Sequence, residues 1–202
     1  MPISYSKYKF NDLDDLNIIT EREKLFSEAI TPFIPSELLM TVLTFNQSLP
    51  LGTEKAKSEL LITPILNELC QRNPESFTYF SGYNFDVDKT LGLKGRCDYL
   101  FSKNYKAARI DAPLFCIVEA KNDDVNNENS LAQCIAEMYA AQLFNQKKHN
   151  DSIKFIYGAV STGFEWIFLK LEYSKINIDT RRYYLNKIEE LLGVLQLIIS
   201  ST

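Results

Sequence analysis

One short segment constrains the fold more than any other: Pro113 to Lys121, with the sequence PLFCIVEAK. Its run of apolar residues after a proline predicts a buried β-strand. The end of the segment breaks this pattern, because Glu119 and Lys121 are charged and stand two positions apart. Side chains alternate across a strand, so both charges lie on one face. The fold therefore has to hold a carboxylate and an ammonium group side by side at the end of a core strand.

A helix is predicted ahead of this strand, between Gly52 and Asn73. Thr53 is a suitable N-cap, and Pro64 is expected to bend the helix where it interrupts the pattern. An apolar stripe recurs at helical spacing. The stripe consists of Leu60, Leu61, Ile65, Leu66 and Leu69. The helix is therefore expected to cover a core and to carry Glu59 at the margin of its apolar face.

The remaining elements follow from apolar periodicity and capping residues. Helices are expected from Ser130 and from Asn186, because each stands three positions before a Gln or Glu, the spacing of a capping box; the partners are Gln133 and Glu189. Further strands are expected at 77–88, 91–102, 153–160 and 164–172. The order is then a helix, three strands, a helix and two strands, with additions at both ends. It predicts an α/β fold, of mixed α+β character, in which helices flank a mixed central β-sheet.

The chain length suits a single domain with a full core, because 46% of its 202 residues are hydrophobic. We expect residues 51–202 to form this domain and residues 1–50 to form an extension packed on it. No apolar run reaches the roughly 20 residues of a membrane span, and the first residues lack a signal-peptide pattern. The sequence therefore predicts a soluble, cytoplasmic protein with no membrane contact.

Cysteine and histidine usage excludes several kinds of site. The cysteines are scattered through apolar contexts, without the close pairs of a zinc site or a disulfide framework. They are Cys70, Cys97, Cys116 and Cys134. The only histidine, His149, lies in a polar stretch. A histidine-based triad, a histidine-ligated metal and a histidine-led nuclease site are therefore not expected.

A second acidic residue, Asp98, is expected near the charged strand end. If the strand that holds Asp98 lies beside the strand that holds Glu119, the two carboxylates come close together. Two carboxylates about 4 Å apart repel each other by about 4 kcal/mol at an effective dielectric constant near 20. Lys121 offsets part of this repulsion, and a divalent cation between the carboxylates would offset the rest. Carboxylate oxygens are hard ligands of the kind that Mg²⁺ prefers.

Three features stand in order along the chain: a helix with Glu59, then Asp98, then the E-x-K of residues 119–121. This arrangement resembles the PD-(D/E)XK nuclease superfamily. The resemblance spans about residues 53–172 and implies a restriction-endonuclease-like core. One position departs from the motif, since Cys97 stands where the name of the motif has proline. Nearly the whole chain, including the stretches GLKGRCDY and AQCIAEMYAA, also resembles a family of uncharacterised bacterial proteins frequent in cyanobacteria.

This resemblance implies a role for each motif position. Asp98 and Glu119 would bind Mg²⁺, for which Mn²⁺ can substitute, and Lys121 would orient and polarise the attacking water. Glu59 would complete the metal shell directly or through water. Gln133 resembles a glutamine that many members place beside the site. The implied function is Mg²⁺-dependent hydrolysis of phosphodiester bonds, with DNA as the substrate.

Basic residues supply candidate contacts to nucleic acid. The loop between the two acidic strands has side chains suited to phosphate contact and base stacking, and we expect it close to the metal. These side chains are Lys103, Tyr105, Lys106 and Arg109. Residues 147–187 hold eight Lys or Arg against four Asp or Glu, a balance of +4, so the remainder of the chain carries −8. An uneven charge of this size is also typical of ordinary solvated surfaces.

Structural roles and other functions remain open. Glu119 and Lys121 can form an ion pair at a strand end, Asp98 or Glu59 can be solvated, and a capping box alone explains Gln133. One alternative function is a non-catalytic binding or assembly module of the same fold. Another is an oligomerisation protein, for instance a homodimer, that uses an apolar stripe on the last helix. This stripe consists of Ile188, Leu191, Leu192, Leu195, Ile198 and Ile199.

Overall fold

The protein is described by a computed structural model over residues 3–26, 30–150 and 152–201. The strands are β1 (Ile19–Glu23), β2 (Thr78–Asn84), β3 (Arg96–Ser102), β4 (Leu114–Ala120), β5 (Ile156–Ser161), β6 (Glu165–Glu172), β7 (Lys175–Asp179) and β8 (Tyr183–Tyr184). They form one sheet in the order β1-β7-β6-β5-β4-β3-β2, and β8 pairs with β6. β1 is parallel to β7, β4 is parallel to β5, and the other neighbours are antiparallel. The sheet is therefore mixed.

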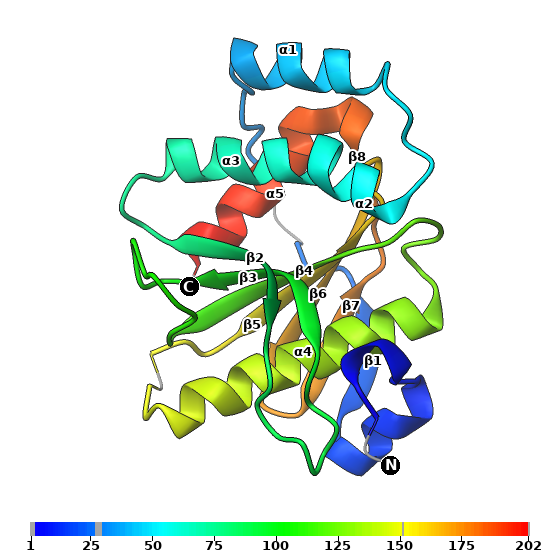
Figure 1. Cartoon of the computed structure of the whole chain (residues 1–202), viewed down its shortest axis with the longest axis vertical. Helices are drawn as coiled ribbons and strands as arrows, with labels where there is room; N and C mark the ends of the chain where they lie inside the picture. The colour runs from blue at the N-terminus through cyan, green and yellow to red at the C-terminus, as the bar shows by residue number, and fades with distance from the viewer. Residues whose placement is uncertain (1–2, 27–29, 151, 202) are drawn as a thin grey trace.

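Helices cover both faces of this sheet. The helices are α1 (Glu37–Asn46), α2 (Glu54–Lys57), α3 (Thr63–Arg72), α4 (Glu128–Lys147) and α5 (Ile188–Ser200), with a π-helical turn η3 (Ser58–Ile62) between α2 and α3. Short 3-10 helices are η1 (Tyr5–Lys7), η2 (Phe10–Leu16) and η4 (Leu185–Lys187). Figure 1 shows α1, α3 and α5 on one side of the sheet, and α4 with the N-terminal 3-10 helices on the other. The predicted mixed sheet flanked by helices, and the predicted order of its central elements, are confirmed.

Three predicted helix starts have different outcomes. The side chain of Thr53 accepts a hydrogen bond from the N–H of Ala56, so the predicted cap of the first helix is confirmed. The predicted capping box at Ser130 does not form, because α4 begins two residues earlier and is capped by Asn127. The predicted capping box at Asn186 does not form either, because a 3-10 turn precedes α5 and no side chain caps this helix.

β4 is the strand on which the core is built. Every residue from Leu114 to Ala120 is buried, which a strand achieves only when both faces of its sheet are covered. Ile117 faces the cluster that contains α4, and its neighbour Val118 faces the cluster that contains α3 and α5. The polar end of this strand therefore lies between two apolar layers.

Pro64 shapes the helix because it cannot donate a backbone hydrogen bond. A proline has no backbone N–H, so the carbonyl of Leu60, four residues earlier, lacks its helical donor. The side chain of Asn46, on α1, donates to that carbonyl at 2.7 Å. The turn just before Pro64 is π-helical, and the N–H of Thr63 bonds to the carbonyl of Ser58. The predicted bend therefore takes the form of a widened turn that is stabilised from α1.

Residues 3–26 and 30–50 pack along the rest of the chain. The backbone N–H of Tyr5 bonds to the carbonyl of Lys94, and the Tyr5 hydroxyl donates to the carbonyl of Phe85. β1 adds a parallel strand to β7 at one edge of the sheet. Within the described residues, no helix has both the length and the apolar character that crossing a membrane requires.

The apolar stripe of α5 belongs to the core. All six of its residues are buried, in the cluster that also contains α3 and one face of β4. The stripe is therefore not an exposed surface on which a second copy could dock, and the alternative of an oligomer formed through this stripe is not supported.

α4 packs closely on the centre of the sheet at Gly158 of β5. A Cβ atom at this position would collide with the side chain of Met138 and lie 3.0 Å from the Cys134 sulfur. We expect Gly158→Ala to lower the free energy of unfolding by about 1–3 kcal/mol, the usual cost of overpacking a core. Gly52→Ala is the matched control, because nothing lies within 4 Å of its Cβ position. Urea denaturation that shows equal stability for the two variants would contradict this packing.

Candidate active site

Strand pairing brings Asp98 and Glu119 together. β3 and β4 are antiparallel, with Tyr99 opposite Val118. Continued one step further, this register would set Asp98 opposite Glu119, and opposed residues point to the same face of a sheet. Asp98 Oδ2 accepts a hydrogen bond of 2.8 Å from the N–H of Ala120. The charge of Asp98 also acts on Glu119, so the two carboxylates lie within electrostatic reach of each other.

The carboxylate of Glu119 is held from the side of α4. Lys121 Nζ donates to Glu119 Oε1 at 2.6 Å and to Gln133 Oε1 at 3.2 Å. Gln133 Nε2 donates to the same oxygen of Glu119 and also to Glu137 Oε1, the latter at 3.1 Å. Only 3% of Glu119 and none of Glu137 is exposed. The amide of Gln133 therefore bridges two buried carboxyl groups, rather than capping α4.

Burial raises the pKa values of these acids, and neighbouring negative charges raise those of Glu119 and Glu137 further. Burial, followed by the charge of Asp98, raises the pKa of Glu119 from 4.5 to about 8, although Lys121 acts in the opposite direction. Burial and the charge of Glu119 raise the pKa of Glu137 well above its ordinary value. Burial also raises the pKa of Asp98, although the hydrogen bond from the N–H of Ala120 and the charge of Lys121 both lower it. The cluster therefore favours protons or another positive charge.

Lys121 remains charged in this cluster. Burial by itself disfavours the ammonium form, but the charge and the hydrogen bond of Glu119 outweigh burial and raise the pKa of Lys121. Smaller contributions from Glu54 and Asp98 have the same direction. The ammonium group is therefore a hydrogen-bond donor at neutral pH.

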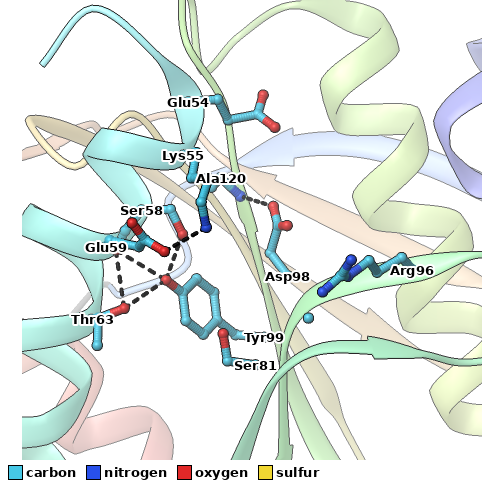
Figure 2. Close-up of a pocket in the computed structure, with 11 residues that line it drawn as sticks. Glu54, Lys55, Ser58, Glu59, Thr63, Ser81, Arg96, Asp98, Tyr99 and Ala120 are labelled. Carbon is cyan, nitrogen blue, oxygen red and sulfur yellow. Dashed lines mark hydrogen bonds and ion pairs between the residues drawn. The ribbon is translucent and has the colours of Figure 1, made fainter.

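A cavity of about 320 Å³ opens on the other side of Asp98. It lies between the α2–η3 segment and the strands β2 and β3, and Figure 2 shows its lining. The hydroxyl of Tyr99 contacts Ser58 Oγ at 2.6 Å and Thr63 Oγ1 at 2.9 Å. Ser58 begins the π-helical turn and Thr63 follows it five positions later, so both hydroxyl groups reach the same phenol. The cavity therefore has a polar, well-ordered wall opposite Asp98.

The helix contributes two acids to this cavity. Glu59, the predicted candidate, lines it, but its side chain is 59% exposed and pairs with Lys55 at 2.5 Å, as Figure 2 shows. Glu54 also lines the cavity, and its charge acts on Lys121. Glu54 is therefore the helix carboxylate with an electrostatic link to the charged strand end. Sequence reasoning missed it because an acid in the first turn of a helix is explained by the helix dipole.

The basic loop lies elsewhere. It joins the end of β3 to the start of β4, whereas Asp98 is near the start of β3 and Glu119 near the end of β4. The five residues from Asp98 to Lys103 span roughly 16 Å of strand. Lys103 donates to the carbonyl of Ile199 on α5, and its ammonium group lies over the Phe115 ring. The expectation that Lys103, Tyr105, Lys106 and Arg109 lie beside the site is therefore wrong.

Glu137 is a buried member of the cluster that sequence reasoning also missed. It stands four residues after Gln133, so both side chains lie on one face of α4. A glutamate on a long helix is usually solvated, and nothing in its sequence context distinguishes it. Its second oxygen, Glu137 Oε2, is buried without a hydrogen-bond partner among the described residues, as is Glu119 Oε2.

The donor set fits a hard divalent cation in part. Among the described residues, no group of three or more His, Cys, Asp or Glu is placed to hold a metal ion. Mg²⁺, however, is commonly bound through one or two carboxylates and several waters. Asp98 and Glu119 supply two carboxylates, and the unpartnered, buried oxygen of Glu119 is an atom that a cation would satisfy.

Comparisons with known protein families, with curated proteins and with solved structures found no match.

The raised pKa of Glu119 predicts a pH-dependent stability. Between pH 4.5 and about 8 the folded chain binds a proton that the unfolded chain releases, so the free energy of unfolding should fall as pH rises. The slope is at most about 1.4 kcal/mol per pH unit for one proton. Glu119→Gln does not titrate at this position, and its stability should fall less over the same range. Parallel profiles for the parent and the variant in urea denaturation at pH 5 to 8 would contradict the assignment.

Proposed function

We propose that this protein is a Mg²⁺-dependent nuclease that hydrolyses phosphodiester bonds in DNA. The observation that carries the proposal is the grouping of Asp98, Glu119 and Lys121 at the end of β4, beside a polar cavity. Burial raises the pKa values of both acids, and the charge of Asp98 raises that of Glu119 further, which favours a bound cation. The resemblance of the motif to the PD-(D/E)XK superfamily supports the same function.

Asp98 and Glu119 would hold the metal. Asp98 uses only Oδ2 to accept from Ala120, and Glu119 Oε2 has no partner among the described residues, so each acid retains one oxygen for a cation. When bound there, Mg²⁺ supplies Lewis-acid activation of water and neutralises charge on the phosphate.

Lys121 would act as a charged donor. Its raised pKa keeps a proton on Nζ at neutral pH, so it can donate to an attacking water or to a phosphate oxygen, and it is not a general base. Glu119 Oε1 and Gln133 Oε1 hold the ammonium group in position. Glu137 acts through Gln133, whose amide it orients.

One observation favours a second candidate, a non-catalytic binding module of the same fold. Glu119 is almost completely buried and already paired with Lys121 and Gln133. Such satisfied pairs also occur in purely structural cores. Metal binding and cleavage separate the two candidates.

The first prediction concerns metal binding. Mg²⁺ or Mn²⁺ at 100 times its dissociation constant should raise the free energy of unfolding by about 2.7 kcal/mol, and EDTA should reverse this. Glu119→Gln should abolish the effect in thermal denaturation. Lys121→Ala should retain or strengthen it, because it removes a nearby positive charge.

A matched pair tests which helix carboxylate serves the site. Glu54→Gln should weaken Mg²⁺ binding, because Glu54 acts on Lys121, whereas Glu59→Gln should leave it unchanged, because Glu59 pairs with Lys55. The reverse ranking of the two variants in a Mg²⁺ titration would favour Glu59.

The next prediction concerns the reaction. The parent with Mg²⁺ should cleave single-stranded, duplex or branched DNA, and EDTA should stop cleavage. Lys121→Ala should lower the rate by about 100-fold or more, the usual loss for such a group. A Lys121→Ala variant that cleaves DNA as fast as the parent would contradict the proposed nuclease function. Mg²⁺ binding by the parent without cleavage of any of these substrates would favour the binding module.

A further inference from the structure

A guanidinium group faces the cavity beside Asp98. It belongs to Arg96, the first residue of β3, and Figure 2 shows it turned toward Asp98 and Tyr99. It lies over Gly82 of β2, where a Cβ atom would be 2.8 Å from Arg96 Nη2 and 3.2 Å from Nε. Gly82 has a φ of +70°, a backbone conformation that favours glycine. The missing side chain at Gly82 therefore creates the space in which the guanidinium group lies.

Within the part of the chain that the structure describes, no partner accepts a hydrogen bond from the guanidinium group of Arg96. Among the described residues, no acid lies within ion-pair distance of its guanidinium group and no acceptor takes a hydrogen bond from it; the ion pairs of the other arginines are with Glu68, Glu190, Glu165 and Asp124. Arg96 acts on Asp98 through its positive charge, which favours the ionised form of Asp98. A planar group of five N–H donors therefore remains available at the cavity.

The neighbours of Arg96 suit a phosphate. Ser81 of β2 lines the same cavity and offers an exposed hydroxyl, and Ser58 and Thr63 supply hydroxyl groups on the opposite wall. Arginine binds phosphate through two parallel hydrogen bonds, and serine hydroxyls commonly contact phosphate oxygens. The carboxylates of the cavity, in contrast, would repel a phosphate that approached without a cation or an arginine.

We propose that Arg96, together with Ser81, binds a backbone phosphate of the nucleic-acid substrate, next to the phosphodiester bond that is cleaved. This inference rests on the proposed function, because it places the substrate in the cavity that Asp98 borders. The site recognises the phosphate and not the base, so it contributes affinity without sequence preference. A merely structural Arg96 would instead balance the charge of Asp98.

The test measures DNA binding in EDTA, where no cleavage takes place. The probes are a fluorescein-labelled 12-nucleotide single strand and a 16-base-pair duplex, followed by fluorescence anisotropy between 50 and 200 mM NaCl. Arg96→Ala should weaken binding of the preferred probe by about 10-fold, as expected for the loss of a charge-assisted hydrogen-bond pair. The dependence of log K on log[NaCl] should become shallower by about 0.7 for the single strand or 0.9 for the duplex.

Two further variants sharpen the result. Arg96→Lys should bind with intermediate affinity, because it keeps the charge and loses the planar fork. Arg109→Ala is the matched control, because Arg109 lies in the loop at the far end of β3, and it should bind like the parent. Thermal denaturation of each variant confirms that it is folded.

Different outcomes separate this inference from the proposed function. Equal affinity and equal salt dependence for Arg96→Ala and the parent would overturn the phosphate site, while Mg²⁺-dependent cleavage by the parent would leave the nuclease function intact. Loss of the Mg²⁺-induced stabilisation in Arg96→Ala, with DNA affinity unchanged, would assign Arg96 to charge balance. A parent that neither binds nor cleaves these probes would reject both.

Discussion

The constraint on which the structure depends is the burial of a carboxylate at the end of the central strand. Glu119 closes a strand that is covered on both faces, and a buried acid is tolerated only when it is protonated or is paired and hydrogen-bonded. Lys121 supplies the charge, and Gln133 supplies a second donor from α4. The close approach of α4 to the sheet, which Gly158 permits, is what brings Gln133 into reach.

Asp98 connects this buried cluster to solvent. It is fixed by the backbone of Ala120 and borders the cavity, while its charge acts on Glu119 behind it. Of the cluster at the strand end, Asp98 is therefore the acid that lines the cavity, together with Glu54 and Glu59 from the helix, while Glu119 and Glu137 are buried.

The helix opposite Asp98 is shaped by contacts that are distant in sequence. Pro64 removes one donor, Asn46 supplies another from α1, and the π-helical turn carries Ser58 and Thr63 to Tyr99. π-helical turns are frequent at functional sites because they change which side chains share a face. Glu54, which acts on Lys121, precedes this turn, whereas Glu59 lies within it and turns toward Lys55.

The sequence by itself determined the central strand, the order of its neighbours and the common face of Glu119 and Lys121, because apolar periodicity and side-chain alternation are local properties. It also singled out Asp98, whose position depends on pairing between consecutive strands. Only the tertiary structure decided that α4 begins at Glu128, that Gln133 binds Glu119, and that Glu137 is buried beside them. It also placed the loop with Lys103 at the far end of β3. These features depend on which elements pack together and on the end of the sheet at which a connecting loop leaves it. The contacts that stabilise them join residues that are far apart along the chain.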